Sequence, residues 1–226
     1  MIRSKFIVMI FTLISLQILC SDKTTAQTED VPKVEVGVHF TSITKPDFSN
    51  GDTEPGFGGR FTFNLNRSIA LEAVGNFFPH NCRFCGRGPV AGDNSGNITQ
   101  GLFGIKAGKR FEKWGVFGKA RPGIVSFSVG DSKYVDTGAG ISFPFELRRQ
   151  RLTNFAADLG AVIEFYPSRR LVTRFEAGDT LIHYRQRQSN FFSFDPITGT
   201  TFLVPFTTRS ETRHNFQFTA GVGWRF

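Results

Sequence analysis

The sequence has few of the residues that build metal centres and lacks the features of several common protein classes. Its 226 residues include only three cysteines and four histidines. The one apolar run near its start, residues 6–19, falls short of the roughly 20 residues that a helix needs to cross a bilayer. Its 24 glycines are spread as Gly-x-Gly instead of forming a nucleotide-binding loop. These absences argue against a membrane-anchor helix and a nucleotide site.

The start of the chain has the three parts of a secretory signal. Arg3 and Lys5 form a positive segment, the apolar run follows, and Thr24-Thr25-Ala26 is a small-residue cleavage site. We therefore expect a signal peptide at residues 1–26 and a short N-terminal periplasmic segment at 27–32.

Removal of the signal peptide takes away three cationic residues and one acidic residue, so the formal charge falls from +8 to +6. An exported basic chain rarely meets nucleic acid, whereas an anionic lipopolysaccharide leaflet would be a ready electrostatic partner. Cys20 follows Leu19 instead of a small residue, so lipidation is not expected.

Two cysteines remain after cleavage. Cys82 and Cys85 stand close to His80, but a closed zinc site takes four ligands and no second cysteine pair follows. In an oxidising compartment we expect a short-loop disulfide, with a free or redox-active pair as the alternative. No metal or other cofactor is predicted.

From residue 33 onward, apolar residues alternate with polar or small ones, which is typical of half-buried strands. In the last such stretch Phe216 and Trp224 fall on one face, while Gln217 and Arg225 fall on the other. Seven further stretches show the same alternation, from residues 34–41, 57–65, 69–77, 100–107, 116–124, 154–165 and 174–179. In the seventh of these eight stretches Asp179 falls on the apolar face, so that strand should leave the membrane nearby.

The connections between these stretches alternate in length. Short turns are expected at 66–68, 109–113 and 167–170, and long polar links at 43–56, 79–97, 129–152 and 185–212. Outer-membrane barrels have short periplasmic turns and long extracellular loops. The sequence therefore predicts an all-β protein, an eight-stranded antiparallel up-and-down transmembrane β-barrel over residues 33–226, with four long extracellular loops and three short periplasmic turns.

A soluble sandwich or lipocalin-like barrel is the alternative, with its apolar face turned inward. The signal peptide, the strand lengths near the roughly 9–11 residues of a spanning strand and the terminal phenylalanine favour the membrane barrel.

Three segments resemble the small outer-membrane β-barrel family: residues 58–64, 69–73 and 221–226. The resemblance covers residues 33–226 and implies a place in the bacterial outer membrane more than an activity. The alternating C-terminal strand is similar to the signal read by the barrel assembly machinery. Its residues here are Phe216, Phe218, Val222, Trp224 and Phe226.

The charged residues predicted to face inward carry both signs. They are Glu35, Arg60, Glu72, Lys106, Lys119, Arg121, Asp158, Glu164, Arg174, Glu176 and Arg225. An ion pathway is one interpretation, but eight-stranded barrels have interiors just wide enough for side chains, which favours a filled network. Asp158 and Glu164 lie six residues apart, about 20 Å along a strand, so they cannot act on one bond.

His183, Ser189 and Asn190 have the residue types of a lipid-modifying enzyme. The spacing is wrong for a compact histidine and serine motif, and no orienting acid follows nearby. His39 and His214 are expected to be ordinary polar wall residues. No catalytic residue is therefore predicted.

The third and fourth long links carry aromatic and arginine residues, which are enriched at binding hot spots. They are Phe143, Phe145, Arg148, Arg149, Arg151, Arg185, Arg187, Phe191, Phe192, Phe194, Phe202, Phe206 and Arg209. Packing between the loops is the alternative role. We expect a monomeric, non-enzymatic, surface-binding barrel whose partners are outer-membrane lipids, lipopolysaccharide or an extracellular ligand. A lipid-A-modifying enzyme and a narrow porin-like channel remain alternatives.

Overall fold

The computed structural model describes residues 31–44, 53–79, 97–136 and 145–226. This part of the chain forms ten β-strands. They are β1 (Val34–Thr44), β2 (Thr53–Asn64), β3 (Ile69–Pro79), β4 (Asn97–Arg110), β5 (Trp114–Asp136), β6 (Phe145–Phe165), β7 (Leu171–Tyr184), β8 (Arg187–Asp195), β9 (Thr200–Thr208) and β10 (Glu211–Arg225). No helix long and apolar enough to cross a membrane occurs in the described ranges.

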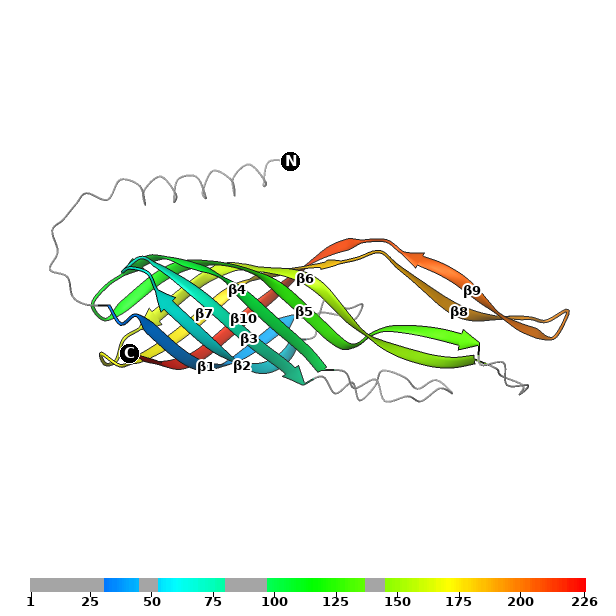
Figure 1. Ribbon diagram of the computed structural model, residues 1–226, viewed down its shortest axis with the longest axis horizontal. Helices are drawn as coiled ribbons and strands as arrows, with labels where there is room; N and C mark the ends of the chain where they lie inside the picture. The colour runs from blue at the N-terminus through cyan, green and yellow to red at the C-terminus, as the bar shows by residue number, and fades with distance from the viewer. Residues whose placement is uncertain (1–30, 45–52, 80–96, 137–144) are drawn as a thin grey trace, which may run out of the picture. The chain divides into compact units, whose positions relative to one another are not determined.

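Eight strands form a closed barrel in the order β1-β10-β7-β6-β5-β4-β3-β2 (Figure 1). Every neighbouring pair is antiparallel, and the barrel closes where β1 meets β10, from Glu35 opposite Arg225 to Ile43 opposite Gln217. Closure leaves no sheet edge with unpaired N–H and C=O groups, which is what a spanning sheet requires in hydrocarbon. The predicted fold class is confirmed.

The three short turns lie where the sequence places them, between β2 and β3, between β4 and β5, and between β6 and β7. We call this end of the barrel the turn end and the opposite end the loop end. Side chains at the turns satisfy free backbone groups; the Asn66 side-chain oxygen, for example, accepts hydrogen bonds from the N–H groups of Ser68 and Ile69, both 2.8 Å.

Two of the four predicted long loops are not loops. Within the link expected at 129–152, β5 and β6 continue as a paired ribbon to Asp136 and Phe145, past a register shift between Phe127 and Asp131. The link expected at 185–212 folds into a separate two-stranded sheet, β8–β9. Polar residues dominate both links, and a polar link between strands predicts an irregular loop. Strands that pair outside a membrane need no apolar face, so a polar segment can still form paired strands.

Strand β7 ends where the predicted link at 185–212 begins. It reaches Tyr184, five residues beyond Asp179. The predicted signal peptide, Cys82, Cys85, His80, Phe143 and most of the first two long links lie outside the described residues.

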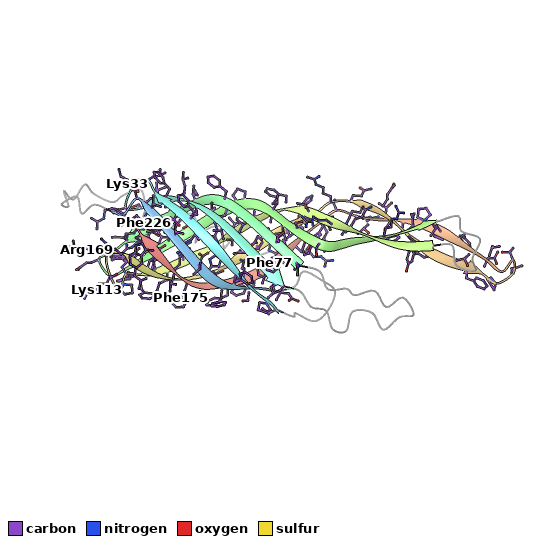
Figure 2. All side chains as sticks on the ribbon, turned by 60° about the horizontal axis from the view of Figure 1, so that its bottom comes forward. Lys33, Phe77, Lys113, Arg169, Phe175 and Phe226 are labelled. Carbon is purple, nitrogen blue, oxygen red and sulfur yellow. The ribbon has the colours of Figure 1, made fainter. Side chains whose placement is uncertain are left out.

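The two faces of the barrel differ in polarity. The outward side chains are large and apolar, and they include Phe40, Phe61, Phe103, Leu159 and Phe218, each between 45% and 79% exposed. Figure 2 shows the side chains projecting around the ribbon, with Phe175 and Phe226 labelled. Most inward side chains are charged or polar and almost fully buried, with apolar ones such as Val74, Leu102 and Phe117 among them. This arrangement of polar interior and apolar exterior is the reverse of that in a soluble barrel. It suits a barrel whose outer surface contacts lipid.

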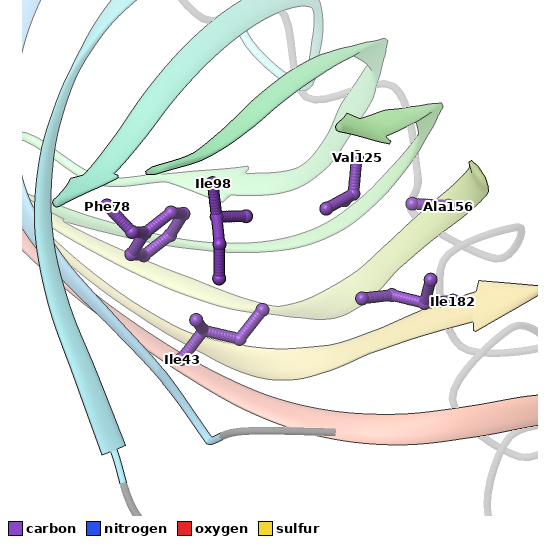
Figure 3. Packing of buried hydrophobic residues seen from close by; sticks show 6 residues of the cluster. All are labelled: Ile43, Phe78, Ile98, Val125, Ala156 and Ile182. Atoms are coloured by element: carbon purple, nitrogen blue, oxygen red, sulfur yellow. The ribbon is translucent and has the colours of Figure 1, made fainter. Parts of the chain in front are cut away.

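Toward the loop end, the interior changes from polar to apolar. Side chains from six strands meet there and form the plug: Ile43, Phe78, Ile98, Val125, Ala156 and Ile182. Figure 3 shows these side chains directed into the space enclosed by the strands. Each is at most 9% exposed, and Phe127 and Tyr184 pack against them.

Candidate functional site

The barrel interior is held together by a network of buried ion pairs. Glu72 on β3 accepts a forked pair of hydrogen bonds from Arg174 on β7, at 2.5 and 2.8 Å. The same carboxylate accepts a hydrogen bond from Arg121 Nη1 at 3.2 Å. A two-bond fork between guanidinium and carboxylate is among the stronger pairings in proteins. Glu72 therefore joins three strands across the lumen.

A second group of ion pairs surrounds Glu176 and Asp158. Lys119 Nζ lies 2.9 Å from a carboxylate oxygen of each. Arg121 donates to both as well, through Nη2 to Glu176 at 2.7 Å and through Nε to Asp158 at 3.0 Å. Lys106 completes the network by donating to Glu164 at 2.5 Å.

At the turn end an aromatic ring lies between cations. The Tyr166 hydroxyl donates to Glu164 at 2.8 Å and accepts from Arg110 Nε at 3.0 Å. The Arg225 guanidinium lies 4.4 Å from the centre of the same ring. Burial and the neighbouring Glu164 carboxylate raise the pKa of Tyr166 above its ordinary value. The turn end of the lumen is thereby filled.

All eleven charged residues predicted to face inward are buried in the interior. The structure brings Asp158 and Glu164 into the same network but pairs them with different cations, as their spacing requires. Sequence reasoning missed Arg110 and Tyr166. Arg110 continues the inward alternation of β4 after Lys106, a signal that was available, whereas Tyr166 lies one residue beyond β6.

Between the charged network and the plug lies a belt of uncharged hydrogen bonds. His39 Nε2 pairs with Asn76 at 2.7 Å, and Asn76 donates to Gln100 at 2.5 Å. Gln100 donates to Gln217 at 3.2 Å, and Gln217 donates to Thr41 at 3.0 Å. His39 is thus a buried polar residue of the barrel interior. From the turn end upward, the lumen is charged, then polar, then apolar.

The β8–β9 hairpin carries most of the aromatic residues singled out in the fourth link. Phe191 and Phe206 face each other across the two strands, with ring centroids 6.0 Å apart. Phe194 and Phe202 are 60% and 48% exposed. The hairpin forms its own sheet, so these rings are not part of the barrel wall.

The tip of this hairpin is a tightly bonded turn. Asp195 accepts a hydrogen bond from the N–H of Ile197 at 2.9 Å and one from the Thr198 hydroxyl at 2.8 Å. These bonds lower the pKa of Asp195, with the Ile197 N–H as the larger cause. Gly199 has φ of 66°, a left-handed conformation that glycine adopts without strain. The turn presents Ile197, which is 93% exposed.

Two polar pairs lie between β7 and β10 on the exterior near the loop end. His214 Nδ1 is 2.5 Å from Asp179 Oδ2, and the two side chains are 74% and 42% exposed. His183 Nδ1 is 2.9 Å from the Thr212 hydroxyl. Sequence reasoning placed His183 with Ser189 and His214 with no partner. Ser189 instead lies on β8 and is 7% exposed, whereas strand pairing brings His183 and Thr212 together.

No group of three or more histidine, cysteine, aspartate and glutamate side chains in the described ranges is placed to hold a metal ion.

A closed β-barrel with an apolar exterior and a charged interior is the architecture of bacterial outer-membrane proteins. The protein is an integral outer-membrane β-barrel.

No family model matches the sequence, and no curated protein matches it. Among solved structures, Ail, the attachment invasion locus protein of Yersinia pestis, is 14% identical with a TM-score of 0.47, covering 86% of this chain and 99% of that chain. Neisserial surface protein A is 10% identical with a TM-score of 0.47, covering 86% and 97%. The Escherichia coli outer membrane protease OmpT is 10% identical with a TM-score of 0.44, covering 91% and 100%. These likenesses concern the fold, which the strand pairing of this chain shows independently.

Proposed function

We propose that this protein is a surface-binding protein whose barrel is a filled anchor and whose β5–β6 and β8–β9 hairpins are the contact surface. In this proposal the turn end faces the periplasm and the hairpins face outward. The observation that carries it is the β8–β9 hairpin, which exposes phenylalanine side chains and Ile197 on a firmly bonded turn. Exposed apolar side chains held in one conformation are typical of an interaction site, because little entropy is lost on binding.

Arginines near the hairpin bases support a second contact. Arg148, Arg151, Arg185 and Arg209 are exposed, and guanidinium groups pair well with phosphate. The phosphates of lipopolysaccharide around the barrel fit this chemistry. We therefore propose lipopolysaccharide as the partner of the arginines and an apolar extracellular surface as the partner of the hairpin tip.

Removal of the hairpin tests the proposal. Deletion of residues 187–208 leaves a four-residue connection between Tyr184 and Glu211, which are paired across β7 and β10. Cells that make this variant should adhere several-fold less to alkyl-coated beads than cells that make the unaltered protein at the same level. The substitutions Phe194→Ser and Ile197→Ser should act in the same direction. Unchanged adhesion would contradict the role of the tip.

The lipopolysaccharide contact has its own test. The double variant Arg185→Gln/Arg209→Gln should retain less lipopolysaccharide through purification in mild detergent, and it should leave bead adhesion unchanged. Equal retention would remove lipopolysaccharide as the partner.

A second candidate, ester hydrolysis on a membrane lipid, is favoured by the exterior pairs Asp179–His214 and His183–Thr212. A histidine oriented by a carboxylate is the arrangement of a general base, and these pairs lie beside lipid-facing Phe155 and Phe216. Cells that make the His214→Gln variant should then have a different lipid A mass profile from cells that make the unaltered protein. Identical profiles would exclude this activity.

A further inference from the structure

Arg60 is the least satisfied cation of the charged network. It lies on β2 and is 4% exposed, yet its Nε and Nη2 have no hydrogen-bond partner among the described residues. Its ion pair with Glu176 is long, at 3.7 Å. Each of the other deep cations has a carboxylate oxygen within 3.0 Å.

The deep part of the network also carries more positive than negative charge. Five cations face four carboxylates there: Arg60, Lys106, Lys119, Arg121 and Arg174 against Glu72, Asp158, Glu164 and Glu176. Glu35, the remaining predicted interior carboxylate, lies toward the turn end and pairs with Arg110 at 3.4 Å. All four deep carboxylates are engaged by the other four cations, so Arg60 is the excess charge.

The wall beside Arg60 offers no side chain to neutralise it. Gly37 on β1 and Gly223 on β10 lie next to its guanidinium, where a Cβ atom would be 3.1 and 3.3 Å from Nη2. No charged side chain other than Arg60 itself is among the nearest atoms at these two positions, which are closely surrounded by backbone atoms and Val172. A buried charge without close partners destabilises the fold, so a compensating charge beside Arg60 stabilises it.

We propose that Arg60 holds a small inorganic anion, such as chloride, inside the barrel, bound by its unpartnered Nε and Nη2. A monovalent ion matches the single excess charge. Its size must be small because the interior of an eight-stranded barrel is largely occupied by side chains. The plug above and Tyr166 below separate this ion from both ends, so it is a structural ion that is taken up during folding.

Equilibrium unfolding in urea tests the proposal on the full barrel in detergent micelles. The unfolding midpoint of the unaltered protein should rise with sodium bromide or chloride and saturate, compared with sodium gluconate at equal ionic strength, because gluconate is too large for the site. In Arg60→Met the halide-dependent shift should be lost. Arg67→Met, at an exposed turn position, is the matched control and should keep the full shift.

Crystals of the unaltered protein grown with bromide give a direct measurement that does not depend on any variant folding. An anomalous bromine peak within hydrogen-bond distance of Arg60 is the expected result. Absence of a peak there, or a halide shift of equal size in Arg60→Met, would overturn the proposal.

Discussion

At the scale of single residues, Glu72 is one of the junctions of the charged network. Its carboxylate is fully buried and pairs with Arg174, Arg121 and Lys106. The substitution Glu72→Gln keeps the shape but removes the charge, which leaves buried cations uncompensated. We expect a loss of about 3–5 kcal/mol in the free energy of unfolding, measured by urea titration of the refolded barrel.

The control for this prediction is Glu211→Gln. Glu211 pairs with Arg213 at an exposed position, 2.8 Å apart, and exposed pairs contribute little to stability. Equal losses in both variants would contradict a stabilising role for the buried network.

Tyr166 gives a pH-dependent prediction. Because its pKa is raised, the folded barrel keeps the phenol proton at a pH where the unfolded chain has lost it. The stability that Tyr166 contributes is therefore present below the ordinary tyrosine pKa of about 10 and is lost as the pH rises above it. In an alkaline titration of tyrosinate absorbance, Tyr166→Phe should remove the component that ionises last. A titration curve unchanged at its upper end would refute this.

At the scale of elements, β4 offers two glycines with opposite surroundings. A Cβ atom at Gly104 would lie 2.1 Å from the Ala120 carbonyl oxygen, which is part of the backbone and cannot turn away, whereas a Cβ at Gly101 meets nothing within 4 Å. Gly104→Ala should lower the free energy of unfolding by about 1–3 kcal/mol, while Gly101→Ala should change it little. The heat-modifiable gel shift and urea unfolding measure both, and a larger effect at Gly101 would contradict the packing described.

Strands β10 and β8–β9 show which features a local sequence pattern can predict and which it cannot. Alternation in β10 placed Phe216 and Trp224 outward and Gln217 and Arg225 inward, because side chains in a strand point to opposite faces regardless of distant residues. The β8–β9 hairpin was not predicted. Its residues surround a turn closed by Asp195 and Gly199, and it forms a two-stranded sheet apart from the barrel wall, so no single apolar face is required and alternation is weak.

At the scale of the whole molecule, we propose that the lumen is filled along its length. The charged network, the uncharged belt and the plug succeed one another from the turn end to the loop end. Planar-bilayer recordings of the purified protein should therefore show no regular current steps, under conditions where a sixteen-stranded porin conducts. Reproducible steps of uniform size would show an open path and refute the filled interior.

The sequence by itself determined the barrel. The eight alternating stretches, the three turns and the inward position of all eleven charged residues follow from a period of two, which is a local property. Only the tertiary structure decided which charges meet. Arg174 and Glu72 are 102 residues apart, and their pairing depends on the closure and register of the barrel. The same holds for His214 with Asp179 and for the unmatched Arg60, because contacts across a lumen or between strands depend on three-dimensional geometry that no local pattern encodes.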